Sequence, residues 1–378
     1  MRLGNSEQVQ LHSTFTIFEP MIIKKRDEVN NKNGEITGGE RRAGIKYVGV
    51  VFLSILLSII ACTSLYSQEI KLSKPKLDGT IKAKYEYATE PGMSRFSVRN
   101  SRLGLTGSVS ERVSYKGQVE LSNEGKFAVL DLYATLRLTK ELSFSLGQMS
   151  LPFFNTYTVT PANLMFANRP FIGKYFAGTR DIGAVAAYKT GWSNFPVIAE
   201  FGLFNGSTIN NPVWTNKPSY VTRVQFGGMD GFRFTAKYYR LPLSDSEDYS
   251  FWGVDARYAG DNYKIETEIM NRYNDFGGVN RISSYIQGSY SFPLDNSRLV
   301  KCIIPALRWD SIGENWGNGM FDNNRLSLGV SFGLTEKPFK SLFRIDYEHY
   351  MVDEAIPEFL TGREIASDKL TFEILIVF

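Results

Sequence analysis

Cysteine and histidine are both scarce in this chain of 378 residues. Its two cysteines cannot build a disulfide framework, because Cys62 lies in an expected leader and leaves Cys302 alone. Of the two histidines, His12 precedes the same leader, so a catalytic serine–histidine pair would depend on His349. No Cys-x-x-Cys, His-Glu-x-x-His, phosphate-loop or dinucleotide motif occurs. The sequence therefore predicts no enzyme, no catalytic residues, no metal site and no cofactor.

Long apolar runs are equally scarce. The only continuous one, residues 47–61, follows several basic residues and is too short to span a bilayer well, which is typical of a secretory signal peptide. We expect cleavage after Ser67. Residues 1–67 would then be a removed extension plus signal peptide, and residues 68–378 a single domain. A lipoprotein signal, with Cys62 as the lipidated residue, is the alternative.

Excess charge is also missing. The net charge of +4 is too small to indicate nucleic-acid binding. Aromatic residues, in contrast, are plentiful at 14%, with 20 tyrosines and 27 phenylalanines. Such a content suits the two aromatic girdles of an outer-membrane β-barrel, whose polar lumen also gives the chain the average composition of a soluble protein.

The chain from Leu77 onward alternates apolar and polar residues in segments of about ten residues, which is the pattern of half-apolar strands. Residues 325–334, for example, place leucine, valine and phenylalanine on one face and arginine and serine on the other. One segment changes parity near Arg99, which predicts a β-bulge. We expect about 16 strands, an even number as in bacterial single-chain barrels.

The last predicted strand, residues 370–378, is apolar on one face and ends at the aromatic Phe378. An exposed edge of this kind favours aggregation in a soluble domain, whereas a membrane barrel turns the apolar face to lipid and pairs the edge. We expect this strand to close the barrel in the outer-membrane lipid and to be recognised by the barrel-assembly machinery.

The predicted connections alternate between tight turns and longer loops. Residues 227–231 and 260–262 are tight, whereas 205–218 and 351–367 are long. Short periplasmic turns and long outer loops give this alternation when the N-terminus is periplasmic. The third outer loop, residues 149–181, is the longest, and we expect it to fold inward and narrow the pore.

Several short motifs in the predicted barrel resemble one known family. They are, in chain order, residues 99–107 (RNSRLGLTG), 147–153 (GQMSLPF), 168–170 (NRP), 180–183 (RDIG) and 202–206 (GLFNG). Together they resemble the phosphate-selective porin O and P family of Gram-negative outer membranes, over about residues 77–378. Two positions depart from the family pattern. Ser150 stands where the family usually has lysine, and Asn100 interrupts a basic run.

The resemblance implies a 16-stranded, trimeric channel whose lumen binds anions through arginines and lysines. Strand parity alone turns nearly equal numbers of basic and acidic side chains into the lumen, so any strong anion preference must come from local grouping. The best group is Lys82, Lys84, Arg102 and Lys116 on three consecutive strands, with Glu86 and Glu120 opposing it. The pore-lining and anion-binding candidates are Lys82, Lys84, Arg102, Lys116, Arg137, Arg223 and Arg308.

These patterns predict an all-β transmembrane antiparallel barrel in the Gram-negative outer membrane. The expected function is a porin, a passive diffusion channel for small solutes, to which the family resemblance adds a preference for phosphate or other anions. The expected partners are small solutes, outer-membrane lipid and two further copies of the chain, and no nucleic acid. The alternative is a structural or adhesive barrel with a plugged lumen that binds partners through its outer loops.

Overall fold

The computed structural model describes residues 74–378 except for 156–159, 177, 193–194, 244–246, 276–279, 296, 318, 337–339 and 354–366. The expected leader and its cleavage after Ser67 lie outside the described residues. Within the described part, no helix has the length and apolar character needed to cross a membrane.

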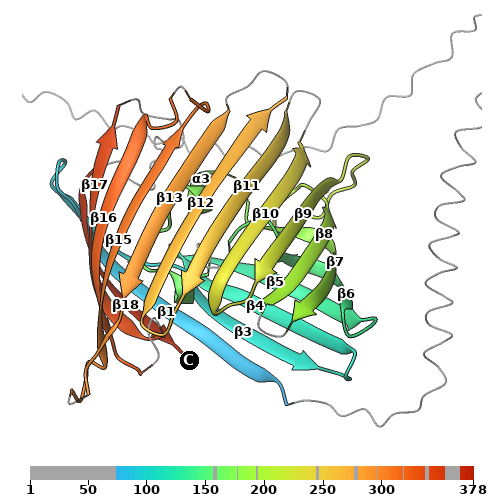
Figure 1. Ribbon diagram of the computed structural model, residues 1–378, viewed down its shortest axis with the longest axis horizontal. Helices are drawn as coiled ribbons and strands as arrows, with labels where there is room; N and C mark the ends of the chain where they lie inside the picture. The colour runs from blue at the N-terminus through green and yellow to red at the C-terminus, as the bar shows by residue number, and fades with distance from the viewer. Residues whose placement is uncertain are drawn as a thin grey trace, which may run out of the picture. The chain divides into compact units, whose positions relative to one another are not determined.

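One antiparallel sheet of 18 strand segments forms the wall of the molecule (Figure 1). The segments are β1 (Lys76–Ala88), β2 (Met93–Val98), β3 (Ser101–Ser108), β4 (Val113–Asn123), β5 (Lys126–Arg137), β6 (Leu142–Ser150), β7 (Arg180–Trp192), β8 (Phe195–Phe204), β9 (Ser219–Gly227), β10 (Gly231–Pro242), β11 (Asp248–Ala259), β12 (Tyr263–Asn274), β13 (Arg281–Tyr290), β14 (Phe292–Pro293), β15 (Cys302–Gly313), β16 (Asn323–Gly333), β17 (Leu342–Val352) and β18 (Lys369–Val377).

The wall is a closed barrel of 16 strands. The segments β2 and β3 both pair with β1, so they are two parts of one interrupted strand. In the same way β13 and β14 both pair with β15 and form one strand. The 18 segments therefore make 16 strands. The first strand pairs with the last, from Thr80 opposite Val377 to Ala88 opposite Lys369. Closure leaves no free edge, and the predicted fold class and strand number are confirmed.

The interruption between β2 and β3 is the bulge predicted near Arg99. On β1 three steps separate Ala83 from Thr80, but their partners Val98 and Arg102 are four residues apart. The extra residue is accommodated at Asn100, which has a positive φ of 57°. Asparagine tolerates this backbone conformation better than most residues, so the residue that departs from the family pattern is suited to the bulge.

Side chains alternate across the wall as expected for a membrane barrel. On β18, Ile374 is 45% exposed on the outer face, whereas its neighbour Glu373 is buried on the inner face at 1%. On β16, Leu328 and Ser327 divide in the same way. The outer face is therefore apolar and the inner face polar, which is the arrangement that lipid and a hydrated lumen require.

One predicted outward residue is not outward. The alternation of residues 128–138 predicts Leu130 on the same lipid face as Leu132, but Leu130 is buried. The pairing with β4 explains this difference, because Gln118 lies opposite Asp131 while the next residue, Val119, lies opposite Val129. Leu130 is the extra residue of a bulge, which parity alone could not reveal.

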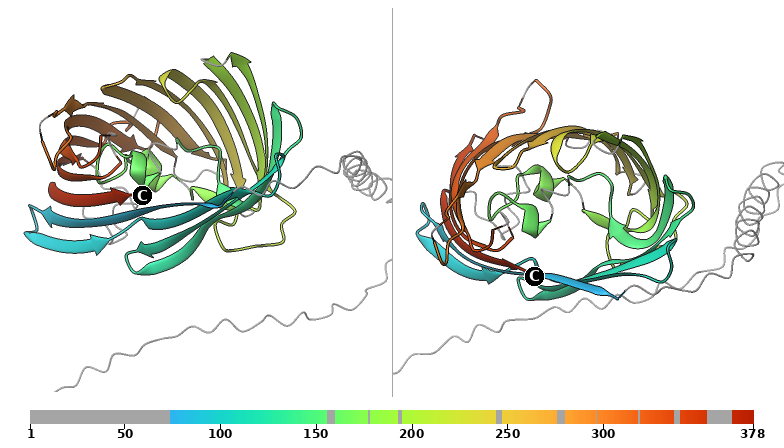
Figure 2. Two further views of the ribbon diagram at one scale, coloured as in Figure 1. Left: turned by 90° about the horizontal axis from the view of Figure 1, so that it is seen from below. Right: turned by 60° about the horizontal axis from the view of Figure 1, so that its bottom comes forward.

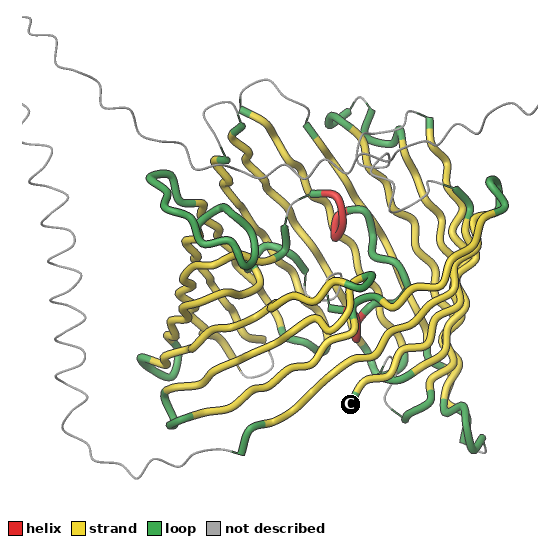
Figure 3. Tube along the Cα trace, turned by 180° about the vertical axis from the view of Figure 1, so that it is seen from behind, coloured by secondary structure: helices red, strands yellow, loops and turns green. Residues whose placement is uncertain are grey.

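The connections divide the barrel into two ends. We call the end with residues 228–230 and 260–262 the short-turn rim, and the end with residues 151–179 and 205–218 the long-loop rim. Residues 151–179, the inserted segment, connect β6 and β7 and contain the 3₁₀ helix η1 (Pro161–Asn163) and the single-turn helix α3 (Ile172–Tyr175). Both helices lie inside the ring of strands in the view along the barrel and in the view from behind (Figures 2 and 3).

Candidate functional site: the lumen and the inserted segment

Lumen side chains on one half of the wall hold the backbone of the inserted segment. Six of its carbonyl groups accept hydrogen bonds from strand cations. The four shortest are Lys82 Nζ to Ala167 O at 2.6 Å, Arg308 Nη1 to Asn168 O at 2.9 Å, Arg325 Nη2 to Arg169 O at 2.8 Å and Arg344 Nη1 to Leu164 O at 3.1 Å, and the other two run from Arg272 to Phe176 O and from Lys264 to Asn163 O. These donors come from β1, β12, β15, β16 and β17. The inserted segment is therefore fixed against this half of the barrel and not suspended in the lumen.

Arg325 is the centre of this attachment. Its guanidinium bonds Asp310 at 2.7 Å and Glu348 at 3.0 Å, and it lies 4.4 Å from the centre of the Phe171 ring. Asp310 also accepts a hydrogen bond of 3.0 Å from the Phe171 backbone N–H. A buried charge must be paired and hydrogen-bonded to be tolerated, so the inserted segment supplies part of what makes this charged wall stable.

An aromatic cluster attaches the other side of the inserted segment, nearer the long-loop rim. Phe153 is fully buried, with its ring 5.5 Å from that of Tyr239 on β10 and 5.7 Å from that of Phe251 on β11. The same core includes Phe171 and Phe176 of the segment and, from the lumen face of the wall, Met270, Tyr285 and Ile312. Apolar side chains thus fill part of a lumen that sequence parity predicted to be polar throughout.

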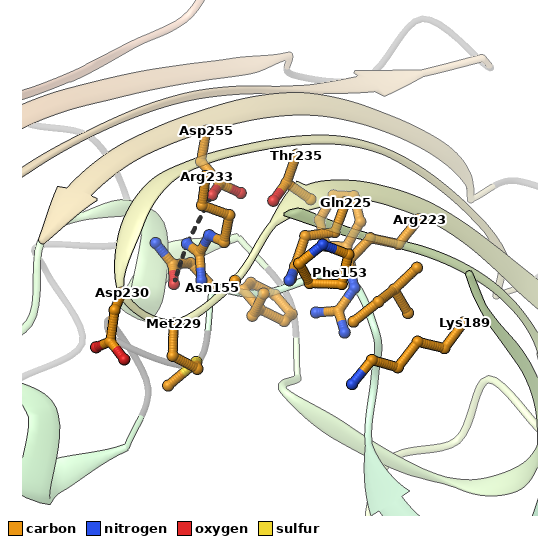
Figure 4. Close-up of a pocket in the computed structure, with 14 residues that line it drawn as sticks. Phe153, Asn155, Lys189, Arg223, Gln225, Met229, Asp230, Arg233, Thr235 and Asp255 are labelled. Atoms are coloured by element: carbon orange, nitrogen blue, oxygen red, sulfur yellow. Dashed lines mark hydrogen bonds and ion pairs between the residues drawn. The ribbon is translucent and has the colours of Figure 1, made fainter. Parts of the chain in front are cut away.

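A cavity of about 630 Å³ remains between Phe153 and the wall formed by β7 to β11, close to the short-turn rim (Figure 4). Its polar lining comes chiefly from Lys189, Arg223, Arg233 and Asp255. A second cavity of about 320 Å³ lies toward the long-loop rim and is lined by Tyr239 and Phe251 among others. The aromatic cluster lies between these two cavities.

The structure gives each member of the predicted cationic group a carboxylate partner. The pairs are Lys82 with Glu373 at 2.8 Å, Lys84 with Glu86 at 2.7 Å, Arg102 with Glu120 at 3.8 Å and Lys116 with Asp131 at 2.7 Å. Lys82 and Lys84 meet Arg99 and Arg169 around a cavity of about 30 Å³, room for roughly one water molecule. Burial, and then the nearby guanidiniums of Arg102 and Arg99, lowers the pKa of Arg169.

The other three candidates lie in different places. Arg308 belongs to the attachment of the inserted segment, and Arg223 lines the larger cavity while forming an ion pair with Glu200. Arg137 is exposed at the short-turn end of β5. The seven candidates therefore do not form one site.

Sequence reasoning missed Lys189 and Phe153. Lys189 follows Val185 and Ala187 on the same face of β7, a parity that was available in the sequence. Phe153 belongs to a loop, for which strand parity makes no prediction.

His349 lies outside the lumen: it pairs with the outward Leu326 on β16, is 48% exposed and contacts Asp368 at 2.8 Å. This outward, exposed position suits a residue of the membrane interface.

Comparison with known proteins agrees with this architecture. Residues 76–218 match the family described as phosphate-selective porin O and P. No curated protein matches the chain.

Solved structures share the fold at low sequence identity. The anion-selective porin from Comamonas acidovorans has a TM-score of 0.56 at 14% identity, covering 81% of this chain and 99% of its own. The outer-membrane channel DcaP of Acinetobacter baumannii has a TM-score of 0.55 at 13% identity, and the match covers 81% of this chain and 97% of DcaP. The trimer form of OmpT from Vibrio cholerae has a TM-score of 0.55 at 11% identity, and the match covers 81% of this chain and 99% of OmpT. Residues 76–218 thus match the phosphate-selective porin O and P family, on a barrel with the fold of the outer-membrane porins.

Proposed function

We propose that the chain is a passive diffusion channel of the outer membrane, and that solutes pass along the β7–β11 side of the lumen. The observation that supports this path is the uneven filling of the barrel. The carbonyl groups of the inserted segment are bonded to β1, β12 and β15–β17, whereas cavities of about 630 and 320 Å³ lie chiefly against β7–β11. The inserted segment is then the constriction of the pore.

The alternative function is a structural barrel with a plugged lumen, and the aromatic cluster is the observation that favours it. Phe153, Tyr239 and Phe251 lie between the two cavities, and a contact of this kind could close the path. Ion current through a planar bilayer separates the two functions. A channel predicts stable single-channel steps from the purified barrel, whereas a plugged barrel predicts a folded, heat-modifiable protein that carries no current.

We also propose that the pore prefers anions over cations only mildly. Lys82, Lys84, Arg102 and Lys116 each have a carboxylate neighbour, which cancels most of the field that would select anions. The reversal potential in a salt gradient measures this preference. We expect a reversal potential close to that of a non-selective pore and shifted slightly toward the equilibrium potential of the anion. A reversal potential near that equilibrium potential would contradict the proposal.

Assembly as a homotrimer is also proposed. Its support is the likeness to OmpT of Vibrio cholerae, a solved structure described as a trimer form.

A further inference from the structure

One side of the larger cavity carries a positive charge that has no carboxylate partner among the described residues. Lys189, on the lumen face of β7, forms no ion pair with any of the described residues. Arg223 beside it is paired with Glu200, and Arg233 bonds Asp255 at 2.8 Å. Figure 4 places Lys189 and Arg223 together on one side of the cavity and Asp230 at the opposite side. The lysine ammonium is therefore the group available to an anion.

Part of the cavity lining is apolar. Phe153 and Phe154 form its boundary toward the inserted segment, and Ile198 and Met229 lie on the wall side. The Phe153 and Phe154 rings meet edge to face at 5.3 Å, and both side chains are nearly fully buried, so this surface is rigid. Met229, at 57% exposure in the turn between β9 and β10, contributes an adaptable apolar side chain.

A single free cation beside an apolar surface suits some anions better than others. Inorganic phosphate is strongly hydrated. It would exchange that water for a cavity whose two arginines already hold carboxylates and whose lysine is a single positive charge, which is unfavourable. An uncharged apolar solute would leave the Lys189 ammonium without a negative charge beside it. A carboxylate carrying a ring satisfies both sides, because its charge meets the lysine while the ring covers the apolar surface.

We infer that this cavity is a binding subsite for amphiphilic organic monoanions, of which aromatic carboxylates are the simplest class. The inference rests on the proposed channel function and names its substrate class. Transient binding of this kind within a pore concentrates the solute and favours its passage, provided that the solute can leave again.

The test compares benzoate with acetate as blockers of chloride current through single channels. In the unsubstituted protein, benzoate blocks at a lower concentration than acetate, because acetate lacks the ring. Lys189→Gln weakens the benzoate block about fivefold, the value of one charge contact near water. Met229→Gln weakens the block by benzoate but not by acetate.

Arg137→Gln is the matched control, since it removes the same charge from an exposed position at the short-turn end of the wall that does not line the cavity. Equal block by benzoate and acetate, or equal effects of Lys189→Gln and Arg137→Gln, would overturn the inference and leave the channel function intact. A protein that carries no chloride current refutes the channel function instead. Saturation-transfer NMR of benzoate with the detergent-folded barrel then decides the inference, and equal signals from the two variants overturn it.

Discussion

Replacing residues 152–176 by a short glycine-serine linker is expected to raise the single-channel conductance several-fold while the barrel still folds. The wall strands complete their backbone hydrogen bonds with one another, from β1–β18 around the sheet, so closure does not depend on the inserted segment. A barrel of 16 strands leaves an aqueous channel when nothing fills it. Side chains such as Arg325 and Asp310, now covered by the segment, would be hydrated in the open lumen.

The control for this deletion is removal of residues 213–216 from the other long connection. Trp214 in that stretch is fully exposed, and residues 205–211 bond the outer side of the wall through Asn210, whose backbone N–H donates to Gln148 Oε1 at 2.7 Å. Shortening it should leave the conductance unchanged. If deletion of 152–176 gives a folded barrel with unaltered conductance, the inserted segment does not constrict the pore.

Phe378→Asp is expected to reduce the amount of folded barrel strongly while the chain is still exported. Phe378 and Gly79 exchange backbone hydrogen bonds of 3.1 and 2.9 Å where β18 meets β1. The aromatic ring also covers Gly79, since a Cβ atom there would lie only 2.4 Å from the ring. A charge at this position replaces an apolar outward contact at the seam that closes the barrel.

Heat-modifiable migration on a gel measures the folded fraction, and Phe127→Asp provides the comparison. Phe127 is likewise an outward aromatic side chain near a strand end, 65% exposed on β5, but it lies away from the seam. A charge near the membrane interface costs little by itself, about 0–1 kcal/mol. Folded barrel in equal amounts from both variants would show that the seam is not specially sensitive to Phe378.

The sequence predicted the wall of this molecule because a period of two residues determines which face a side chain takes. Ile374 and Glu373 illustrate this, as does the bulge at Asn100, where the parity changes visibly. Leu130 was placed wrongly because its bulge leaves the apolar pattern intact.

The lumen was predictable only in part. Parity turned Lys82 and Arg308 inward correctly, but their partners are Glu373 and a backbone carbonyl of the inserted segment, contacts between residues far apart in the chain. The aromatic cluster went unpredicted because strands such as β10 carry large apolar residues on both faces at one level, as at Tyr238 and Tyr239. Such a pair marks a depth at which the lumen is also apolar, and this signal could have been used.

The most direct test of the proposed path is thiol labelling, during current recording, of a cysteine introduced at either of two positions. Gln225→Cys lies on the lining of the larger cavity, whereas Ser327→Cys lies on β16, where Ser327 is fully buried beside Arg308. The native Cys302 is buried, so the unsubstituted protein serves as the blank. We predict that a charged methanethiosulfonate reagent reduces the current of Gln225→Cys within the recording and leaves Ser327→Cys unchanged. Rapid block of Ser327→Cys with no effect on Gln225→Cys would place the path on the opposite side of the lumen and contradict the account.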